Sequence, residues 1–366
     1  MGTIISYIEE YGQLTFKEMP FNEVDALVLA QFSYLKFEGL VPKITDNTAS
    51  ISMNDMRIKM TEEVVFADER YEKDNRLLFA AMADSNRFGT MKCNCYATII
   101  DDTVETQFCA ITCLLKDSLP VIVYRGTDEN LVGWKEDFHM AFKKPVPGQN
   151  LSVLYLNQVS ARIAGDFFVC GHSKGGNLAV YSAMNVYPQA QRRIKRIYSF
   201  DGPGFRPEIL SSEKYEAIAD RIEKYIPKSS LVGMILENHE DYFVVDSYSI
   251  GLLQHDPYTW RVEETSFVAK EEIYKHSRFR NDALNEWILK LDDTQLELFI
   301  ETLFHVLEGC DSDNLIDMAV DWKKSVAGMI RAVKDIDEET RNMILEIFRV
   351  LLEVFKENVK ENLKKR

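Results

Sequence analysis

Apolar residues recur at helical spacing in the first quarter of the chain. Asn22 is a typical helix-capping residue, and the apolar positions that follow it lie three or four residues apart. These positions are Val24, Leu27, Val28, Phe32 and Leu35. Residues 61–85 repeat this periodicity, and we expect one or two further helices there. The amino-terminal part of the chain is therefore predicted to be helical.

From residue 91 onward the pattern changes to short apolar runs separated by turns and helices. Strands are predicted at 91–100, 106–116, 121–124, 167–170 and 196–200, with later strands around 242–248 and 259–262. Helices at 151–164 and 177–184 lie between them. Alternation of strand and helix is typical of α/β proteins, in which helices cover both faces of a mostly parallel sheet. We therefore expect this fold class.

Beyond residue 280 the apolar spacing is purely helical. Residues 294–297 form a capping box, and an acidic start at 337–339 precedes a helix that ends in three basic residues. We predict two units: residues 1–280, with the sheet and the amino-terminal helices, and a helical subdomain at 281–366. An apolar stripe at helical spacing usually packs into a core, so packing is favoured over a lid or a partner-binding surface.

Composition narrows the functional classes. The chain has 366 residues, 46% of them hydrophobic, and a formal net charge of −15, which argues against a nucleic-acid-binding surface. It has no apolar run long enough to cross a membrane and no signal-peptide pattern, so the cytoplasm is the predicted compartment. The six cysteines lack Cys-x-x-Cys spacing, so we expect free thiols and neither a zinc site nor a cofactor.

The segment 171–176 has the sequence Gly-His-Ser-Lys-Gly-Gly and lies between a predicted strand and a predicted helix. This pattern indicates a nucleophile elbow, the sharp turn that lifts a serine hydroxyl to where a base can reach it. Gly171 and Gly175 permit the close backbone approach of such a turn. Ser173 is the predicted nucleophile, and the amide of Lys174 is a predicted oxyanion donor. The alternative is a glycine-rich turn that carries an incidental serine.

Residues 124–127, Tyr-Arg-Gly-Thr, end a predicted strand upstream of the elbow, and Trp134 and Asp137 follow shortly after. Together with the elbow, this order of motifs resembles the class 3 lipases, the fungal-lipase-like branch of the α/β-hydrolases. The resemblance implies an α/β-hydrolase fold with an oxyanion hole formed by the amides of Thr127 and Lys174. Taken alone, the turn at 124–127 would equally suit a simple strand end.

The chain also resembles an uncharacterised bacterial family of lipase-like proteins, a domain of unknown function. The shared motifs lie at 20–27, 171–179, 200–205 and 254–260. This resemblance spans most of residues 20–262, and it implies the fold rather than a substrate.

The general base is chosen from six histidines, because the base of an α/β-hydrolase follows the nucleophile and the acid in the chain. His172 adjoins the nucleophile, and its side chain is expected to point away from that of Ser173. Four others come too early, lie in a polar loop, or fall near the predicted helical subdomain: His139, His239, His276 and His305. We predict His255 as the base, with a capping or buried structural histidine as the alternative.

The triad acid has three candidates. Asp201 ends the strand after the elbow, at the sheet edge where α/β active sites collect. Asp246 is the alternative acid, whereas Asp256 adjoins His255 and would have to bend back to its ring. The class 3 resemblance implies an aspartate near residues 225–230, where this chain has serines at 229 and 230. This departure favours Asp201, although a simple turn-capping role for Asp201 stays open.

These parts predict a serine hydrolase that cleaves a carboxylic ester, with a small-molecule ester or lipid as substrate. Ser173 would form an acyl-enzyme that water then hydrolyses. The alternatives are an inactive hydrolase-fold scaffold or interaction protein, and a thioesterase or peptidase on the same fold. A transient contact with a membrane surface and the oligomeric state stay open. We expect the side chain of Lys174 to face solvent from the first helical turn.

Overall fold

The computed structural model describes most of the chain up to residue 270. The described residues are 2–46, 49–67, 71–101, 106–127, 145–228, 230, 232–234, 242–249 and 251–270, with the helical positions Glu338 and Asn342. Apart from those two positions, the predicted subdomain 281–366 lies outside the described residues. The same holds for Trp134, Asp137, His139, His239, His276, His305 and Cys310.

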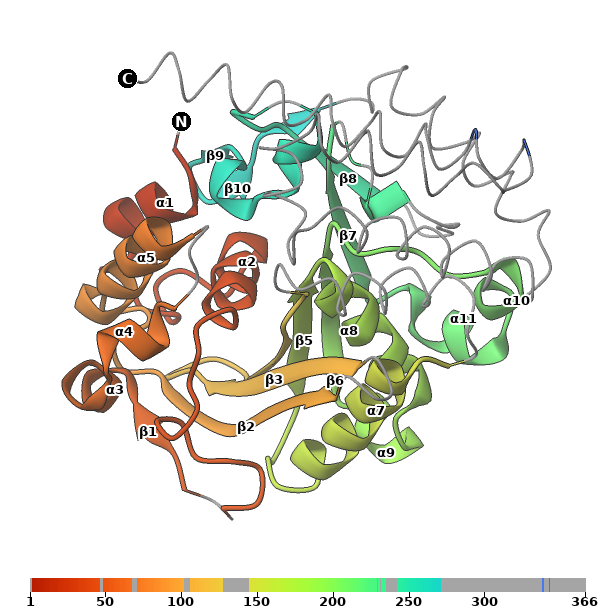
Figure 1. The fold of residues 1–366 in the computed structure, drawn as a ribbon, viewed down its shortest axis with the longest axis horizontal. Helices are drawn as coiled ribbons and strands as arrows, with labels where there is room; N and C mark the ends of the chain where they lie inside the picture. Colours follow the sequence, from red (N-terminus) through yellow and green to blue (C-terminus); the bar gives the residue numbers. More distant parts are fainter. Residues whose placement is uncertain are drawn as a thin grey trace.

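A nine-stranded sheet runs through the described part of the molecule (Figure 1). The strands, in spatial order, are β1 (Ile51–Ser52), β2 (Lys92–Asp101), β3 (Thr106–Leu114), β4 (Val121–Tyr124), β5 (Phe167–His172), β6 (Ile194–Phe200), β7 (Ile222–Pro227), β8 (Tyr242–Val245) and β11 (Ala269–Lys270). Strands β4 to β8 are parallel neighbours, whereas β1, β2, β3 and β11 pair antiparallel.

The expectation of a mostly parallel sheet is therefore right only for the block β4–β8. Strands β2 and β3 follow one another too closely for the long crossover that a parallel pair requires, so they form an antiparallel hairpin. The strand expected at 259–262 is also largely wrong. A 3-10 turn, η3 (Pro257–Thr259), takes its place before β9 (Val262–Glu263), which pairs with β10 (Ser266–Phe267) in a separate ribbon.

The helices cover both faces of the sheet. They are α1 (Ile4–Tyr11), α2 (Glu23–Phe32), α3 (Met53–Lys59), α4 (Glu62–Val65), α5 (Glu72–Asp84), α7 (Pro147–Ser160), α8 (Lys174–Asn185), α9 (Pro188–Gln191), α10 (Pro207–Leu210) and α11 (Glu213–Ala219), with the 3-10 turns η1 (Val232–Met234) and η2 (Gly251–His255). The predicted cap of α2 is confirmed, because the Asn22 side chain accepts from the amides of Val24 and Asp25 at 3.0 Å.

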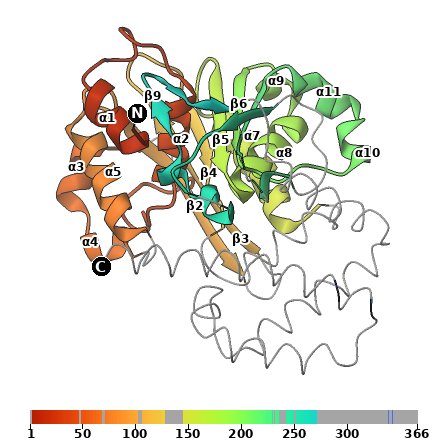
Figure 2. The same ribbon diagram turned by 90° about the horizontal axis from the view of Figure 1, so that it is seen from above.

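Among the described residues, alternating side chains of the central strands pack into two large cores. In β4, Val121 and Val123 pack with helices α1, α2 and α5, whereas Ile122 and Tyr124 pack with α7 and α8. Figure 2 shows these two groups of helices on opposite sides of the sheet. The central strands β4 and β5 are therefore covered on both faces.

A buried ion pair joins the amino-terminal helices. Asp25 on α2 and Arg87 after α5 are fully buried, and Arg87 Nε donates to Asp25 Oδ1 at 2.7 Å. The Tyr7 hydroxyl of α1 donates to the same oxygen at 2.9 Å. Buried charges are stable only when they are paired and hydrogen-bonded, so this cluster ties three chain segments together.

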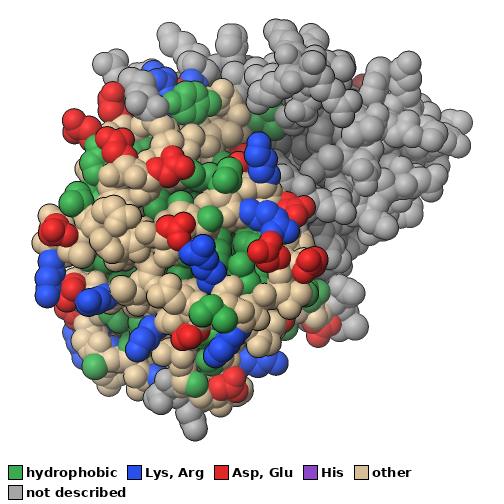
Figure 3. All heavy atoms as spheres, turned by 90° about the vertical axis from the view of Figure 1, so that its left-hand side faces the viewer, with side chains coloured by type: hydrophobic (Ala, Val, Ile, Leu, Met, Phe, Trp, Pro, Cys, Tyr) green, Lys and Arg blue, Asp and Glu red, His purple; other side chains and the backbone are tan. Residues whose placement is uncertain are grey.

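The outer surface of these helices carries charges of both signs (Figure 3). Arg76 pairs with Glu62 at 2.5 Å and with Glu72 at 2.9 Å, and Arg57 pairs with Asp84 at 2.6 Å. This face is thus a solvated helical surface rather than a patch of one sign. In the described part of the chain, no helix combines the length and apolar character needed to cross a membrane.

Candidate active site

Ser173 occupies a sharp turn between strand β5 and helix α8. Its φ of 58° and ψ of −131° lie in a region that residues with a side chain rarely adopt. Ser173 N donates to the Phe200 carbonyl at 2.9 Å, and Gly176 N donates to the Ser173 carbonyl at the same distance. Backbone strain of this kind persists where the surroundings enforce it, and functional turns are a common place for it.

Two glycines allow three backbone segments of the chain to pack closely beneath this turn. A Cβ atom on Gly171 would lie 2.2 Å from the carbonyl oxygen of Gly175. A Cβ atom on Gly175 would lie 2.1 Å from the carbonyl oxygen of Tyr124, at the end of β4. Side chains cannot be accommodated at such distances, so the close approach inferred from the sequence is present in the fold.

The turn after β4 packs against the elbow. A Cβ atom on Gly126 would lie 3.1 Å from the Cβ of Ser173 and 2.7 Å from the carbonyl oxygen of His172. Thr127, the next residue, is half-buried. Lys174 is the first residue of α8, where the helix dipole favours negative charge. The two amides predicted to stabilise an oxyanion therefore come from segments that meet at Ser173.

His255 contacts Asp201. His255 ends the 3-10 turn η2, and its Nδ1 donates to Asp201 Oδ2 at 2.6 Å. A carboxylate oxygen accepts, so Nδ1 carries a proton, and in the neutral ring Nε2 then has the lone pair. Asp201 follows β6 with a φ of 48° and is fully buried. The fold thus brings together a histidine and an aspartate that lie 54 residues apart.

The second carboxylate oxygen of Asp201 has two donors. The Ser230 hydroxyl donates to Oδ1 at 2.5 Å, and the Gly233 amide donates to it at 3.1 Å. Ser230 is buried after β7, in the stretch where the class 3 resemblance implies an aspartate. The sequence marked this serine only as a departure. In the fold, its hydroxyl supports the aspartate at the end of the neighbouring strand.

The alternative acid, Asp246, is engaged elsewhere. It accepts from Lys228 and Arg261 at 2.5 Å each, and Lys270 lies 3.3 Å away. Burial opposes ionisation of this carboxyl, but hydrogen bonds from Lys228, the Ser247 amide and Arg261 outweigh burial and hold its pKa at about 2. Asp246 therefore acts as an ion-pair centre at the end of β8. Asp256 accepts from the Tyr258 amide at 2.9 Å and caps η3.

A second histidine lies beside His255. His172 Nε2 lies 2.8 Å from the carbonyl oxygen of His255, and His172 Nδ1 lies 3.0 Å from the hydroxyl of Tyr34. The two imidazole rings are 4.5 Å apart between centroids. Neither contact was expected from the sequence. Tyr34 lies just after α2 in no recognisable motif, and only the fold brings it to the elbow.

The expectation that the Lys174 side chain faces solvent is wrong. Lys174 is only 1% exposed. The first two turns of α8, from Lys174 to Val180, are buried throughout, so this end of the helix has no solvent-facing side. The predicted free cysteines are confirmed for Cys93, Cys95, Cys109, Cys113 and Cys170, all of which are buried.

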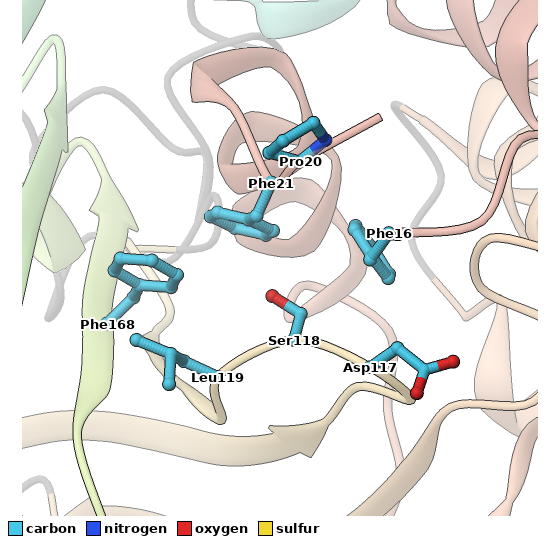
Figure 4. A pocket seen from close by; sticks show the side chains of 7 residues that line it. All are labelled: Phe16, Pro20, Phe21, Asp117, Ser118, Leu119 and Phe168. Atoms are coloured by element: carbon cyan, nitrogen blue, oxygen red, sulfur yellow. The ribbon is translucent and has the colours of Figure 1, made fainter. Parts of the chain in front are cut away.

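A pocket of about 460 Å³ lies away from these residues (Figure 4). It is lined by Phe16, Pro20, Phe21, Asp117, Ser118, Leu119 and Phe168. Phe168 is paired with Val121 at the amino ends of β5 and β4, whereas Ser173 follows the carboxyl end of β5. The pocket is therefore at the amino-terminal ends of these strands, opposite the end at which Ser173 lies. Within the described ranges, no group of His, Cys, Asp and Glu side chains is arranged to hold a metal ion.

Comparison with known proteins places the chain in a family. A model of the Mbeg1-like family matches residues 82–305, which is more than half of the chain. No curated protein matches the sequence. A Rhizomucor miehei lipase, solved as a propeptide complex, is 14% identical over 60% of this chain and 66% of its own, with a TM-score of 0.38.

The match to the Rhizomucor lipase spans slightly less than two thirds of that enzyme's length. The M37 lipase is 15% identical, with 58% of this chain and 70% of its own covered and a TM-score of 0.35. The family match includes the elbow at 171–176, together with Asp201, Ser230 and His255. The chain belongs to the Mbeg1-like family, which is lipase-like.

Proposed function

We propose that this protein is a serine hydrolase that cleaves carboxylic esters through Ser173, His255 and Asp201. The observation that carries the proposal is the 2.6 Å hydrogen bond from His255 Nδ1 to the buried carboxylate of Asp201. A carboxylate in this position fixes the imidazole tautomer and stabilises the imidazolium that forms during acyl transfer. Membership of a lipase-like family supports an ester or lipid substrate.

The proposed reaction proceeds in two halves. His255 Nε2 takes the proton of Ser173 Oγ, which attacks the ester carbonyl, and the alcohol leaves with that proton. Water then attacks the acyl-enzyme with His255 again as the base, which releases the carboxylic acid. The amides of Thr127 and Lys174 would donate to the oxyanion in both halves. One such donor is typically worth about 10²- to 10³-fold in turnover.

A fluorophosphonate probe tests this proposal, because it phosphonylates only an activated serine. We expect the full chain to be labelled at Ser173, and Ser173→Ala to lose the label while keeping its unfolding transition. Ser182→Ala is a matched control, since Ser182 lies on the same helix with its hydroxyl bonded to the Ala179 carbonyl. Folded wild-type protein that takes up no label would make an inactive scaffold the better account.

Esters of p-nitrophenol with acyl chains of increasing length would then separate a lipase from a short-chain esterase. Activity that rises with chain length supports a lipid substrate, and activity confined to acetate and butyrate supports a small ester. Matched thioester and peptide substrates cover the remaining alternatives on this fold.

The acid is tested by paired substitutions. Asp201→Asn keeps the size of the side chain but removes its charge, and we expect kcat to fall about 10³- to 10⁴-fold. Asp246→Asn disrupts the ion-pair centre and should leave kcat within about threefold of wild type, because Asp246 is engaged by Lys228 and Arg261. The assignment is wrong if only Asp246→Asn loses activity.

A further inference from the structure

His172 contacts the main chain of the proposed base, whereas Asp201 contacts its side chain. His172 is only 4% exposed and ends β5 immediately before the nucleophile. We infer that His172, held by Tyr34, is a positioning residue that sets the distance between His255 and Ser173. This inference rests on the proposed function and extends it to residues that do not touch the reacting atoms.

The chemistry of the contacts selects one tautomer of His172. A carbonyl oxygen only accepts, so the 2.8 Å contact to the His255 carbonyl requires a proton on His172 Nε2. In the neutral ring Nδ1 is then an acceptor, and it receives the Tyr34 hydroxyl at 3.0 Å. The hydroxyl of Tyr34 thus keeps the Nε2 proton of His172 directed at His255.

Because His172 is bonded to Ser173 in the chain, its contact with the His255 carbonyl constrains the distance between nucleophile and base. His172 and Ser173 are adjacent in the chain, so fixing the carbonyl of His255 on His172 also fixes it relative to the elbow. The turn that carries His255 has a second anchor, because the Trp260 indole donates to the Gln254 carbonyl at 2.7 Å. His172 therefore supplies the tie that runs directly from this turn to the strand of the nucleophile.

The position of Tyr34 supports the same arrangement. A Cβ atom on Gly126 would lie 2.1 Å from the Tyr34 hydroxyl and 3.1 Å from the Cβ of Ser173. The hydroxyl is therefore wedged beside the turn at 125–127, close to the nucleophile. Only a glycine at 126 leaves room for it, so the turn, the tyrosine and His172 interlock.

The test compares variants that keep or remove the donor. His172→Phe retains a ring but lacks the N–H, and we expect kcat to fall about 10- to 100-fold with KM within about twofold. His172→Gln places an amide N–H near the former Nε2 and should recover most of kcat. Tyr34→Phe removes the hydroxyl that fixes the tautomer of His172, so we expect kcat to fall several-fold. Tyr187→Phe is the control, because Tyr187 is 67% exposed.

A spectroscopic readout separates this inference from the proposed function. The His255 Nδ1 proton in its short hydrogen bond should give a far-downfield proton resonance that Asp201→Asn abolishes. We expect His172→Phe to shift or broaden this resonance, His172→Gln to retain it, and Tyr187→Phe to leave it unchanged. These spectra report on His255 whether or not the protein hydrolyses esters.

The outcomes are distinct. Unlabelled wild-type protein whose downfield resonance still responds to His172→Phe would overturn the proposed function and support the positioning role. A folded His172→Phe variant with wild-type kcat and an unchanged resonance would overturn the positioning role. So would His172→Gln that folds like wild type, as judged by its unfolding midpoint, but recovers neither kcat nor the resonance.

Discussion

Asp201 has a donor for each carboxylate oxygen, and one of these donors is a histidine, which sets it apart from the other acidic residues considered for the site. His255 occupies Oδ2, while Ser230 and the Gly233 amide occupy Oδ1. A buried carboxylate is costly without such partners, and with them it is stable and held in one orientation. Ser230 thus contributes to the site although it replaces the aspartate that the class 3 pattern implies.

Ser230→Ala tests this support. The substitution removes one donor to Asp201 and leaves the Gly233 amide as the remaining donor to Oδ1. We expect kcat to fall about tenfold, and unfolding free energy to fall by about 1–3 kcal/mol from the partly unsatisfied oxygen. Steady-state kinetics and urea denaturation measure the two effects. The control is Ser211→Ala, whose hydroxyl bonds the Pro207 carbonyl at the surface and should change neither. Unaltered kcat in Ser230→Ala would contradict the supporting role.

At this scale the sequence predicts some contacts and misses others for a physical reason. Ser173 stands in a local motif, and His255 follows it in the expected chain order, so both could be proposed from the linear sequence. The bonds of Asp201 to Ser230 and of His172 to Tyr34 join residues 29 and 138 positions apart. Such contacts depend on strand order, which a linear pattern does not contain.

Among the secondary-structure elements, the parallel strands place the residues of the candidate site and its surroundings at their carboxyl ends. Ser173 follows β5, Asp201 follows β6, Ser230 lies after β7 and Asp246 follows β8. Neighbouring strands lie about 4.8 Å apart, so each step along the sheet moves a residue by roughly that distance. His255 therefore contacts the carboxylate at the end of β6, next to the strand that precedes Ser173. Asp246, at the end of β8, instead pairs with cations at the ends of β7 and β11.

The ion-pair centre at Asp246 predicts a pH-dependent stability. Its pKa is held at about 2, below the ordinary value of 3.8, so its stabilisation is present above pH 4 and is lost as pH falls through about 2. We expect Asp246→Asn to lose about 1–2 kcal/mol of unfolding free energy at pH 7, after allowance for solvent around the partly exposed cations. The gap to wild type should narrow to about half by pH 3 in urea denaturation. A gap that is constant from pH 7 to pH 3 would contradict the ion-pair account.

The strands and long helices follow from periodicity, but the short elements do not. Helices α2, α5 and α7 and strands β2 to β6 and β8 lie where apolar spacing places them, within a few residues at each end, whereas no strand was expected at β7. The turn η2 spans five residues, too few for any period to register. The antiparallel part of the sheet was missed because alternation of strand and helix begins only after β4.

In the described part of the molecule, the sheet separates two large cores, and the amino-terminal helices complete one of them. Asp25 and Arg87 hold these helices together from α2 to the end of α5, with Tyr7 on the same carboxylate. Because these charges are fully buried, each depends on the other for its hydrogen bonds. The cluster makes α1, α2 and the segment after α5 a single cover for one face of the sheet.

Asp25→Asn is expected to destabilise the protein by about 3–5 kcal/mol, since it leaves the guanidinium of Arg87 buried without its counter-charge. Thermal and urea unfolding measure the loss. Asp84→Asn is the matched control, because Asp84 pairs with Arg57 at the surface, where such a pair is worth about 0–1 kcal/mol. Equal losses in the two variants would show that burial of the pair has no special weight.

The amino-terminal cover has a consequence for how this chain can be divided. Tyr34 leaves α2 and reaches the elbow, yet it precedes residue 82, where the family match begins. The segment shared with the family therefore contains the proposed nucleophile, base and acid but lacks Tyr34, which contacts the residue next to Ser173. Proteolytic removal of the first 81 residues would therefore remove Tyr34 from the candidate site together with the helices that cover this face of the sheet. A domain boundary placed at the start of the shared segment would therefore separate the candidate site from helices on which it depends.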